Sequence, residues 1–335
     1  MSIEKNQRNL KLLVISLSIS IAVIFAILLF TIDENTILSL RRIKPQFLLL
    51  ALLLQVSTWF LWSIRISTMA KMISSDHKLS IRESMSIVIA NLFLAAITPS
   101  MAGGEPVRIH LLSKKGLSGG CATAITLGER VFDAIFILVM VPFALFTFQY
   151  MISIREIRIG LIIGIILFIS AVSLFFYMAA RPEAAKKFLL KIFKKTKKEG
   201  FIERIEGFVD EFHRGSKLIF KRSNIGGIVA VSILTILSWF VGFLIPSCIL
   251  VGLGHNPVIL QSIAAQILLL VIIMMPTTPG SSGVAEVGAS ALYSSFVNTS
   301  ILGILILLWR FITYYVNIIV SAIFQYKVLR SLLRK

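Results

Sequence analysis

Apolar runs alternate with short polar segments along most of the chain. Six of these runs have about the length of a membrane-spanning helix, which needs roughly 20 residues; they cover residues 12–32, 47–64, 117–151, 159–178, 225–252 and 301–322. Between Ser223 and Trp309 the only Asp, Glu, Lys or Arg is Glu286, a length that no soluble core hides. The pattern predicts an all-α, polytopic membrane protein with about six full spans.

Two further apolar runs are interrupted before they end. Residues 87–97 stop at Thr98-Pro99 and a Gly103-Gly104 pair, and residues 258–275 stop at a Pro-, Ser- and Gly-rich segment, 276–283. Non-helical backbone at membrane depth is tolerated only where protein or a wet cavity satisfies its polar groups. We therefore expect two re-entrant helical hairpins, the first returning near Lys114 and the second over 284–296.

The segments around the two breaks match each other at a constant shift of 180 residues. The matching positions that carry most weight are Thr98/Thr278, Pro99/Pro279, Gly103/Gly283 and Arg130/Arg310. The expected order of spans makes the first hairpin enter from the cytoplasm and the second from outside, so the copies form an inverted repeat, an architecture of transporters. We expect one domain over 1–335, with repeat one about 10–155, repeat two about 156–325, and a basic insert at 181–222.

Composition agrees with a membrane protein: 57% of residues are hydrophobic, 15% are charged and the mean hydropathy is +0.90. The net charge of +18 is concentrated in loops, since 13 of the 34 Lys and Arg residues lie between Arg181 and Arg222. Basic loops remain on the cytoplasmic side, so both termini and the insert are expected there, in a cell-membrane protein that does not bind nucleic acid. The insert has the pattern of amphipathic helices, which either lie on an anionic leaflet or only orient the chain.

Tryptophans and a basic residue follow the second run. Trp59 and Trp62 occupy the place of an interfacial aromatic belt, and Arg65 comes directly afterwards. Such a sequence is typical of a span that has reached the membrane surface. We therefore expect the second span to end near Ile64, with Arg65 on the cytoplasmic side.

The hairpins bring polar groups into the membrane interior, where each charge is costly. The starts of their return helices, at Gly103-Gly104 and Gly280 to Gly283, are predicted to offer free backbone N–H groups to an anion such as phosphate. Arginine side chains from separate helices suit bidentate contacts to the same ligand. The candidate substrate-binding residues are Gly103, Gly104, Glu105, Arg108, Arg130, Gly280, Gly283, Glu286 and Arg310.

A structural interpretation of the same charges stays open. Glu105 and Arg108 are spaced i,i+3, as are Arg130 and Asp133, so both pairs suit intrahelical bridges. Glu129 and Asp133 are accordingly assigned to structural pairing. For Glu286 there are three alternatives: it pairs with Arg130 or Arg310, it is protonated, or it caps the start of its helix.

No cofactor or metal is expected. The four histidines share no ligand spacing, the two cysteines define no disulfide framework, and neither a Ser-His or Cys-His set nor a Walker lysine motif is evident. A membrane enzyme acting on lipid phosphate is the weaker alternative, and we expect no enzymatic activity.

Three motifs carry a resemblance over nearly the whole chain: Gly103-Gly104-Glu105-Pro106-Val107-Arg108, Glu129-Arg130-x-x-Asp133 and Pro279-Gly280-x-x-Gly283-x-x-Glu286. The sequence resembles the transmembrane region of lysylphosphatidylglycerol synthetases, also called flippase-like integral membrane proteins. The resemblance implies a domain that moves lipids such as aminoacylated phosphatidylglycerol or polyprenyl-linked sugars between leaflets.

Members that transfer aminoacyl groups carry a large soluble domain after the membrane region, and this chain reaches only Lys335. Aminoacyl transfer is therefore not expected. The leading hypothesis is a translocase for an anionic or polyprenyl-phosphate-linked lipid, with membrane lipids as its partners. The alternative is an accessory subunit of an envelope glycosyltransferase or another lipid-modifying system, which predicts an envelope-synthesis enzyme as a partner.

Overall fold

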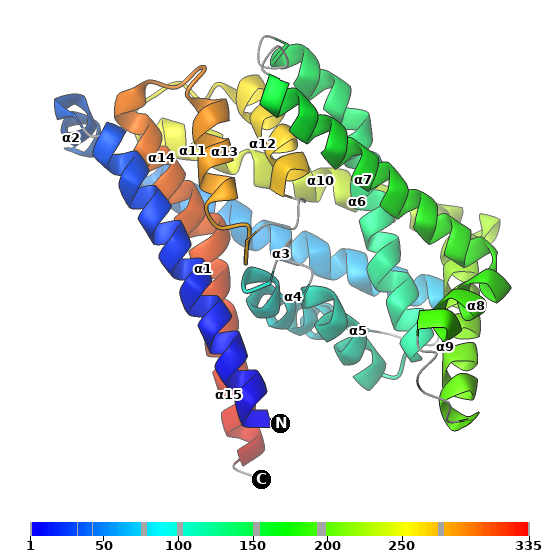
Figure 1. The fold of residues 1–335 in the computed structure, drawn as a ribbon. Coiled ribbons are helices and arrows are strands. Elements are labelled where there is room, and N and C mark those ends of the chain that lie inside the picture. Colours follow the sequence, from blue (N-terminus) through cyan, green and yellow to red (C-terminus); the bar gives the residue numbers. More distant parts are fainter. Residues whose placement is uncertain are drawn as a thin grey trace.

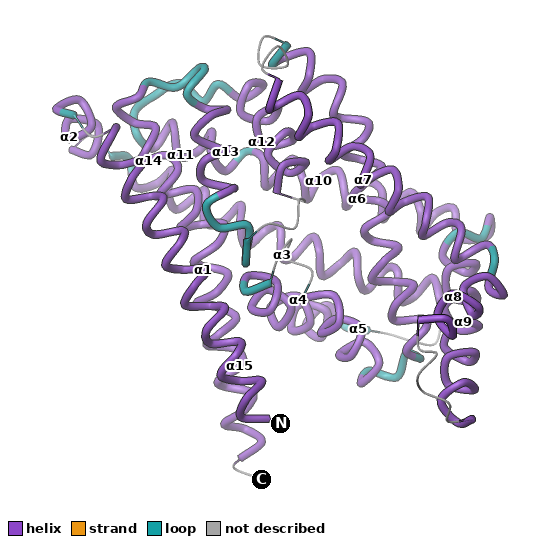
Figure 2. The backbone as a smooth tube through the Cα atoms, viewed as in Figure 1, coloured by secondary structure: helices purple, strands orange, loops and turns teal. Residues whose placement is uncertain are grey.

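The protein is built from helices throughout the residues that the computed structural model describes: 2–31, 33–41, 43–74, 79–98, 103–149, 155–192, 199–273 and 278–333. The first half contains α1 (Ser2–Thr31), α2 (Glu34–Arg41), α3 (Pro45–Ile73), α4 (Ile81–Ala96), α5 (Gly104–Lys114), α6 (Gly119–Thr147) and α7 (Arg155–Ala180). The second contains α8 (Pro182–Ile192), α9 (Glu199–Ile219), η2 (Arg222–Asn224), α10 (Ile225–Phe243), α11 (Ile245–Gly252), α12 (Ile259–Ile273), α13 (Val284–Tyr293), α14 (Thr299–Arg310), η3 (Phe311–Tyr315) and α15 (Val316–Leu333). Figures 1 and 2 show this all-helical chain.

Five helical stretches in the described ranges are long and apolar enough to cross a membrane: 45–73, 119–147, 162–180, 222–252 and 299–326. They correspond to five of the six predicted spans. The remaining one, 12–32, is occupied by α1, whose apolar described part, Leu17–Thr31, is shorter. The prediction of an all-α polytopic membrane protein is confirmed.

The two interrupted runs form two pairs of short helices, α4–α5 and α12–α13. The loop after α5 lies toward the end where both termini are found, whereas the loop after α13 lies at the opposite end (Figure 1). The breaks meet in the middle of the molecule, where the Gly280 N–H donates to the Thr98 carbonyl at 3.0 Å and the Tyr314 hydroxyl donates to the Ala96 carbonyl at 3.0 Å. Residues 99–102 and 274–277, including Pro99, lie outside the described residues.

The second span differs from its prediction. Helix α3 continues to Ile73, so Arg65 lies inside it and is buried rather than at the cytoplasmic surface. Trp59 is also buried, and its indole N–H donates to Asn317 of α15 at 3.1 Å. Neither residue marks the membrane boundary, because each has a polar partner within the helix bundle.

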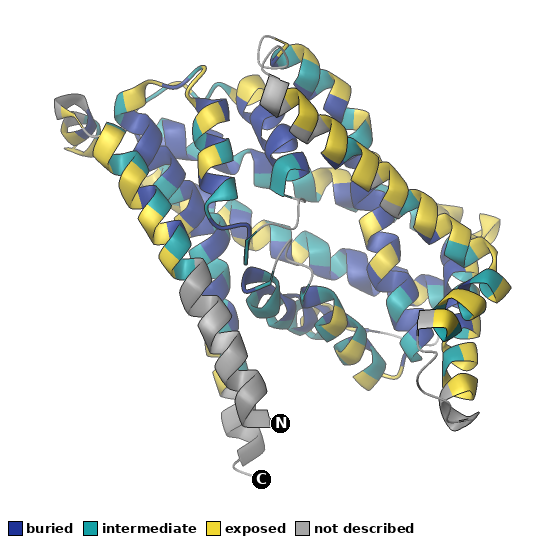
Figure 3. Cartoon of the chain, viewed as in Figure 1, coloured by how far each residue is buried: buried dark blue, intermediate teal, exposed yellow. Residues whose placement is uncertain are grey.

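Apolar side chains cover the outside of the bundle. Helix α7 exposes a series of isoleucines and leucines (Figure 3), among them Ile162, Ile166 and Leu167, as expected of a surface in contact with lipid. The amphipathic insert forms α8 and α9, and α9 packs along α6, where the Gly120 N–H donates to Glu211 at 3.1 Å. Lys186 of α8 pairs with Asp210 of α9 at 2.9 Å, which raises the pKa of this lysine. The lysines between 193 and 198 lie outside the described residues.

Candidate functional site

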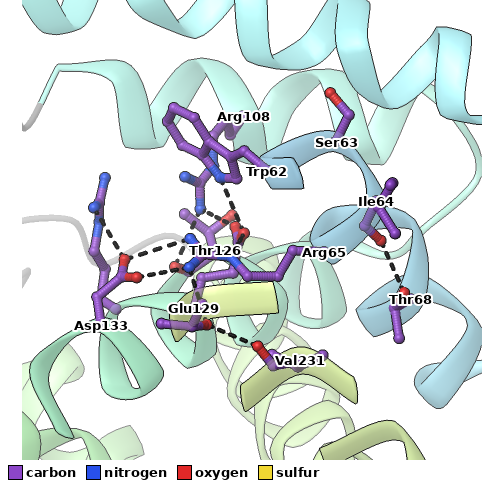
Figure 4. Close-up of polar contacts among 12 residues, drawn as sticks. Trp62, Ser63, Ile64, Arg65, Thr68, Arg108, Thr126, Glu129, Asp133 and Val231 are labelled. Carbon is purple, nitrogen blue, oxygen red and sulfur yellow. Dashed lines mark hydrogen bonds and ion pairs between the residues drawn. The ribbon is translucent and has the colours of Figure 1, made fainter. Parts of the chain in front are cut away.

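Three arginines and three carboxylates from α3, α5 and α6 form one network of ion pairs, and Figure 4 shows its buried part around Arg65, Arg108, Glu129 and Asp133. Arg65 of α3 lies at its centre, with Nε 2.9 Å from Glu129 and Nη1 2.6 Å from Asp133. Arg108 of α5 reaches Glu129 at 2.5 Å. Arg130 of α6 and Glu105 of α5 complete the set. The three arginines and three carboxylates balance in formal charge. Such balance is what allows ionised groups to remain in a membrane interior.

The two i,i+3 pairs are the weaker part of this network. Arg108 lies 3.7 Å from Glu105, and Arg130 lies 3.4 Å from Asp133. The short contact of Arg130 is instead to Glu105 on the neighbouring helix, at 2.6 Å. The charges therefore link α3, α5 and α6, and intrahelical bridges alone do not account for them.

Arg108 is fully buried yet incompletely paired. Its Nη2 donates to the Thr126 carbonyl at 3.2 Å and to Glu129, and its guanidinium lies 5.2 Å from the ring centroid of Trp62. Its Nε and Nη1 have no hydrogen-bond partner in the described part of the chain. Buried donors without partners are costly, and here the stacked indole covers them.

Arg130 differs from the other two arginines in its exposure, since 44% of its side chain is accessible. Its Nε donates to Glu105 at 2.7 Å, Nη2 contacts the same carboxylate and Nη1 donates to Asp133. A guanidinium has five N–H donors. Two donors of Arg130 therefore have no partner among the described residues.

The second repeat contains an equivalent but sealed pair. Arg310 of α14, the counterpart of Arg130, contacts Glu286 at the start of α13 with Nε 2.7 Å from Oε1, and both side chains are buried. Its guanidinium also lies 4.1 Å from the ring centroid of Tyr314. Pairing with Arg310 is therefore one of the alternatives for Glu286 that the structure shows. In both repeats, an arginine pairs with the carboxylate at the start of the hairpin's second helix: Arg130 pairs with Glu105, and Arg310 pairs with Glu286.

Glu286 also fulfils the capping alternative, because its Oε2 accepts the Gly283 N–H at 2.7 Å. The Ser20 hydroxyl of α1 donates to its Oε1. In the first hairpin, the Gly103 N–H donates to the Thr98 hydroxyl oxygen at 2.8 Å. The expectation of free backbone N–H groups at both tips is therefore wrong for Gly103 and Gly283, whose own hairpins satisfy them.

Glycine is required at two of the candidate positions for steric reasons. Gly280 has φ +60°, and a Cβ there would lie 2.5 Å from the Tyr314 hydroxyl. Gly104 packs against Asn91 of α4, whose side-chain amide would overlap with any Cβ. These glycines let the hairpins close and let their tips meet, so their first role is close packing.

A cavity of about 250 Å³ lies beside the network, between α3, α6, α10, α11, α12, α14 and η3. Arg65, Arg130 and Asp133 line it, whereas Arg310 does not. The described lining residues are Gln55, Thr58, Trp62, Arg65, Arg130, Asp133, Ser238, Trp239, Gly242, Phe243, Ile245, Gln266, Leu270, Trp309 and Thr313.

Eight of these positions form four pairs that are 180 residues apart: Thr58/Ser238, Trp62/Gly242, Arg65/Ile245 and Asp133/Thr313. A cavity lined by equivalent positions lies where the two copies face each other. The side chains differ within each pair, however. The charged lining residues Arg65, Arg130 and Asp133 all come from the first copy, and the second copy supplies neutral residues. The cavity is therefore charged on one side and neutral on the other.

The sequence reasoning missed several residues of this site, above all Arg65, Gln266 and Trp239. Trp239 donates its indole N–H to Asp133 at 3.1 Å, and Gln266 contacts Tyr293. One signal for Arg65 was present, because apolar residues continue past it to Met72 and Ile73. No signal in the sequence distinguishes Gln266 or Trp239 from other residues of apolar helices.

Comparison with known proteins places the chain in a family. The profile described as the lysylphosphatidylglycerol synthase TM region matches residues 13–321. The chain belongs to this family. Similar members include a UPF0104 membrane protein of Archaeoglobus fulgidus, 36% identical over 330 residues that make up 95% of this chain and 97% of that protein. A UPF0104 membrane protein of Methanocaldococcus jannaschii is 25% identical over 96% of both chains. No solved structure matches.

The matched range includes most of α1, both hairpins and the first part of α15, so membership extends over most of the membrane bundle. The resemblance expected from the motifs is thereby confirmed. The match covers 97% of the Archaeoglobus fulgidus protein and 96% of the Methanocaldococcus jannaschii protein, and both are described as membrane proteins. The residues of the cavity and of the charged network all lie within the range that matches the lysylphosphatidylglycerol synthase TM family.

Proposed function

We propose that this protein is a lipid translocase, in which the central cavity receives the headgroup while the acyl or prenyl chains remain in the surrounding lipid. The observation that carries the proposal is the cavity itself. It lies between equivalent positions of the two repeats and contains an arginine with unused donors. Substrate sites at mid-membrane between repeats are characteristic of transporters.

The substrate that suits this site is an anionic or polyprenyl-phosphate-linked lipid. The two unused N–H donors of Arg130 suit an oxygen pair of a phosphate, while Glu105 and Asp133 hold the rest of the guanidinium in place. Both termini and the basic insert are placed on the cytoplasmic side of the cell membrane in this proposal, in keeping with their charge.

The test is lipid movement in vesicles that contain the purified protein. Fluorescent phosphatidylglycerol and a fluorescent polyprenyl phosphate are each incorporated, and their exposure to an impermeant quencher is followed over time. We expect Arg130→Lys to slow movement nearly as much as Arg130→Ala, because lysine keeps the charge but loses the planar fork. The matched control is Arg82→Lys, at an exposed position of α4.

Two results would contradict the proposal. Unchanged movement in Arg130→Ala would remove the arginine from the site. Absence of movement with the unmodified protein, together with stable co-purification of an envelope-synthesis enzyme, would favour the accessory-subunit alternative.

A further inference from the structure

The cavity is larger and more aromatic than a phosphate requires. Its volume of about 250 Å³ is many times the roughly 10–15 Å³ that a cavity needs in order to hold one water molecule, so it has room for more than a small ion. Three indoles line it, Trp62, Trp239 and Trp309. The remaining space must therefore take a larger group whose surface suits aromatic rings.

Two of these indoles are fixed in orientation by the charged network. Trp62 donates its N–H to Glu129 at 3.0 Å, and Trp239 donates to Asp133 at 3.1 Å. Because their polar atoms are occupied, these two residues offer ring surface to the cavity and no further hydrogen bond. Ring surface of this kind packs against flat groups with C–H faces.

The cavity offers no free negative charge. Asp133 is the only carboxylate among the described lining residues. Its Oδ1 accepts bonds from Arg65 and Trp239, and its Oδ2 accepts bonds from Arg65 and Arg130. A headgroup ammonium would find no unpaired carboxylate here, and an uncompensated cation at this depth is costly. In addition, the Arg108 guanidinium already lies over the ring of Trp62.

Neutral hydrogen-bonding groups complete the lining. Gln55 donates its amide to Asn317 at 3.1 Å, and Gln266 donates to the Tyr293 hydroxyl at 3.1 Å. Their carboxamide oxygens have no partner among the described residues and serve as acceptors. Ser238 adds a hydroxyl. Acceptors spread around ring surfaces match a ligand that carries several hydroxyl donors.

We infer that the headgroup of the translocated lipid carries an uncharged, hydroxyl-rich ring, that is, a sugar, which lies among the indoles and carboxamides while its linking phosphate contacts Arg130. This inference rests on the proposed translocase function and specifies its substrate class. It separates this chain from transport of aminoacylated lipids, whose amine has no counter-charge in the cavity.

Tryptophan fluorescence provides a direct binding test, because all four tryptophans of the chain (59, 62, 239 and 309) are at or beside the cavity. The protein in phosphatidylcholine nanodiscs is titrated with a prenyl glucosyl phosphate, phosphatidylglycerol, lysyl-phosphatidylglycerol and free methyl glucoside. We expect saturable quenching by the glycosyl phosphate at the lowest concentration. Equal quenching by free methyl glucoside would show that the cavity binds the sugar without a lipid, which would overturn the inference that the sugar belongs to a lipid.

Variants connect the binding to the inferred acceptors. Gln266→Leu keeps the size but removes the carboxamide, and we expect about a threefold to tenfold loss of affinity for the glycosyl phosphate, the effect of one hydrogen bond, and a smaller loss for phosphatidylglycerol, whose glycerol offers fewer hydroxyls. Gln261→Leu, at an exposed position of the same helix, is the matched control. Because Gln266 also contacts Tyr293, Ser238→Ala is tested with Ser232→Ala as a second pair. Equal effects in a variant and its control would overturn the assignment of that acceptor.

Movement across the membrane separates this inference from the function on which it rests. If vesicles move the glycosyl phosphate and not phosphatidylglycerol, the inference is supported. If they move phosphatidylglycerol or its lysyl form at least as fast as the glycosyl phosphate, the sugar assignment fails while the translocase function stands. If no lipid moves and none quenches the fluorescence, both fail.

Discussion

Arg65 is the residue on which the charged network depends most. It contacts both Glu129 and Asp133, and it is buried in α3. Replacing it by methionine leaves two buried carboxylates with fewer partners, and removing one member of a buried ion pair costs about 3–5 kcal/mol. We expect Arg65→Met to lower the free energy of unfolding in detergent by about this amount. Arg82→Met, at an exposed site, serves as the control, and an equal effect in both variants would contradict this role.

The structure also changes how Arg130 must be tested. Removing Arg130 and Asp133 together would be a clean deletion if they paired only with each other. Arg130 has its short contact with Glu105, and Asp133 has its own with Arg65. The double variant therefore removes the shortest ion-pair contact from each of two other charges, Glu105 and Arg65, and loss of activity in it says nothing about phosphate.

Candidate residues could be predicted only in part. Charges in apolar surroundings identified Glu105, Arg108, Glu129, Arg130 and Asp133, because an ionised group there needs a reason to persist. Arg65 was missed because its partners lie 64 and 68 residues further along the chain. Without them, a charge after an apolar run has the pattern of a helix end.

At the scale of elements, the first hairpin depends on close contact between its two helices. At Gly104 a Cβ would overlap with the Asn91 side chain and lie 3.1 Å from its carbonyl oxygen. Overpacking of this kind costs typically about 1–3 kcal/mol, so we expect Gly104→Ala to lower the melting temperature clearly. Gly207→Ala is the control, since a Cβ at that position in α9 meets nothing within 4 Å. A melting temperature unchanged in both variants would contradict this packing.

The exposed ends of the same hairpin are joined by Lys115 and Glu83, 2.6 Å apart. The lysine, together with the Ser80 N–H and hydroxyl, lowers the pKa of the Glu83 carboxyl from 4.5 to about 2. A depressed pKa in the folded state gives stability that is present above the ordinary pKa and lost as pH falls toward the folded value. We therefore expect the difference in melting temperature between the wild type and Glu83→Gln to shrink from about pH 5 downward. A difference that is constant with pH, or matched by Glu203→Gln on α9, would contradict this linkage.

Helical elements were more predictable than their ends. Both hairpins could be predicted from the Pro- and Gly-rich breaks. Proline and glycine interrupt a helix, and in a membrane the backbone groups that lose their helical hydrogen bonds need other partners. The end of α3 was placed at Ile64 and lies at Ile73, the result of reading Arg65 as a surface residue. The turn of π-helix at Phe311–Tyr315 directly follows Arg310, and no pattern of residues in the sequence predicts it.

At the scale of the whole molecule, the repeat boundaries and the orientation in the membrane remain predictions. In a background without Cys121 and Cys248, we expect a cysteine at Asn298 to react with an impermeant thiol reagent added outside, and one at Lys217 to react only after permeabilisation. Both positions are exposed, so accessibility alone does not separate them. Labelling of both from the same side would reject the inverted arrangement.

The contact between the hairpin tips, Gly280 to Thr98, has an electrical consequence. The two breaks meet each other in the middle of the molecule, and hairpins that bring polar backbone to membrane depth would make the apolar layer between the two aqueous phases locally thin. The transmembrane potential then falls over a short distance. Each elementary charge that crosses this layer gains or loses about 2.3 kcal/mol per 100 mV. In the proposed translocase, a lipid phosphate that moves past Arg130 would therefore be driven or opposed by the resting voltage of the cell.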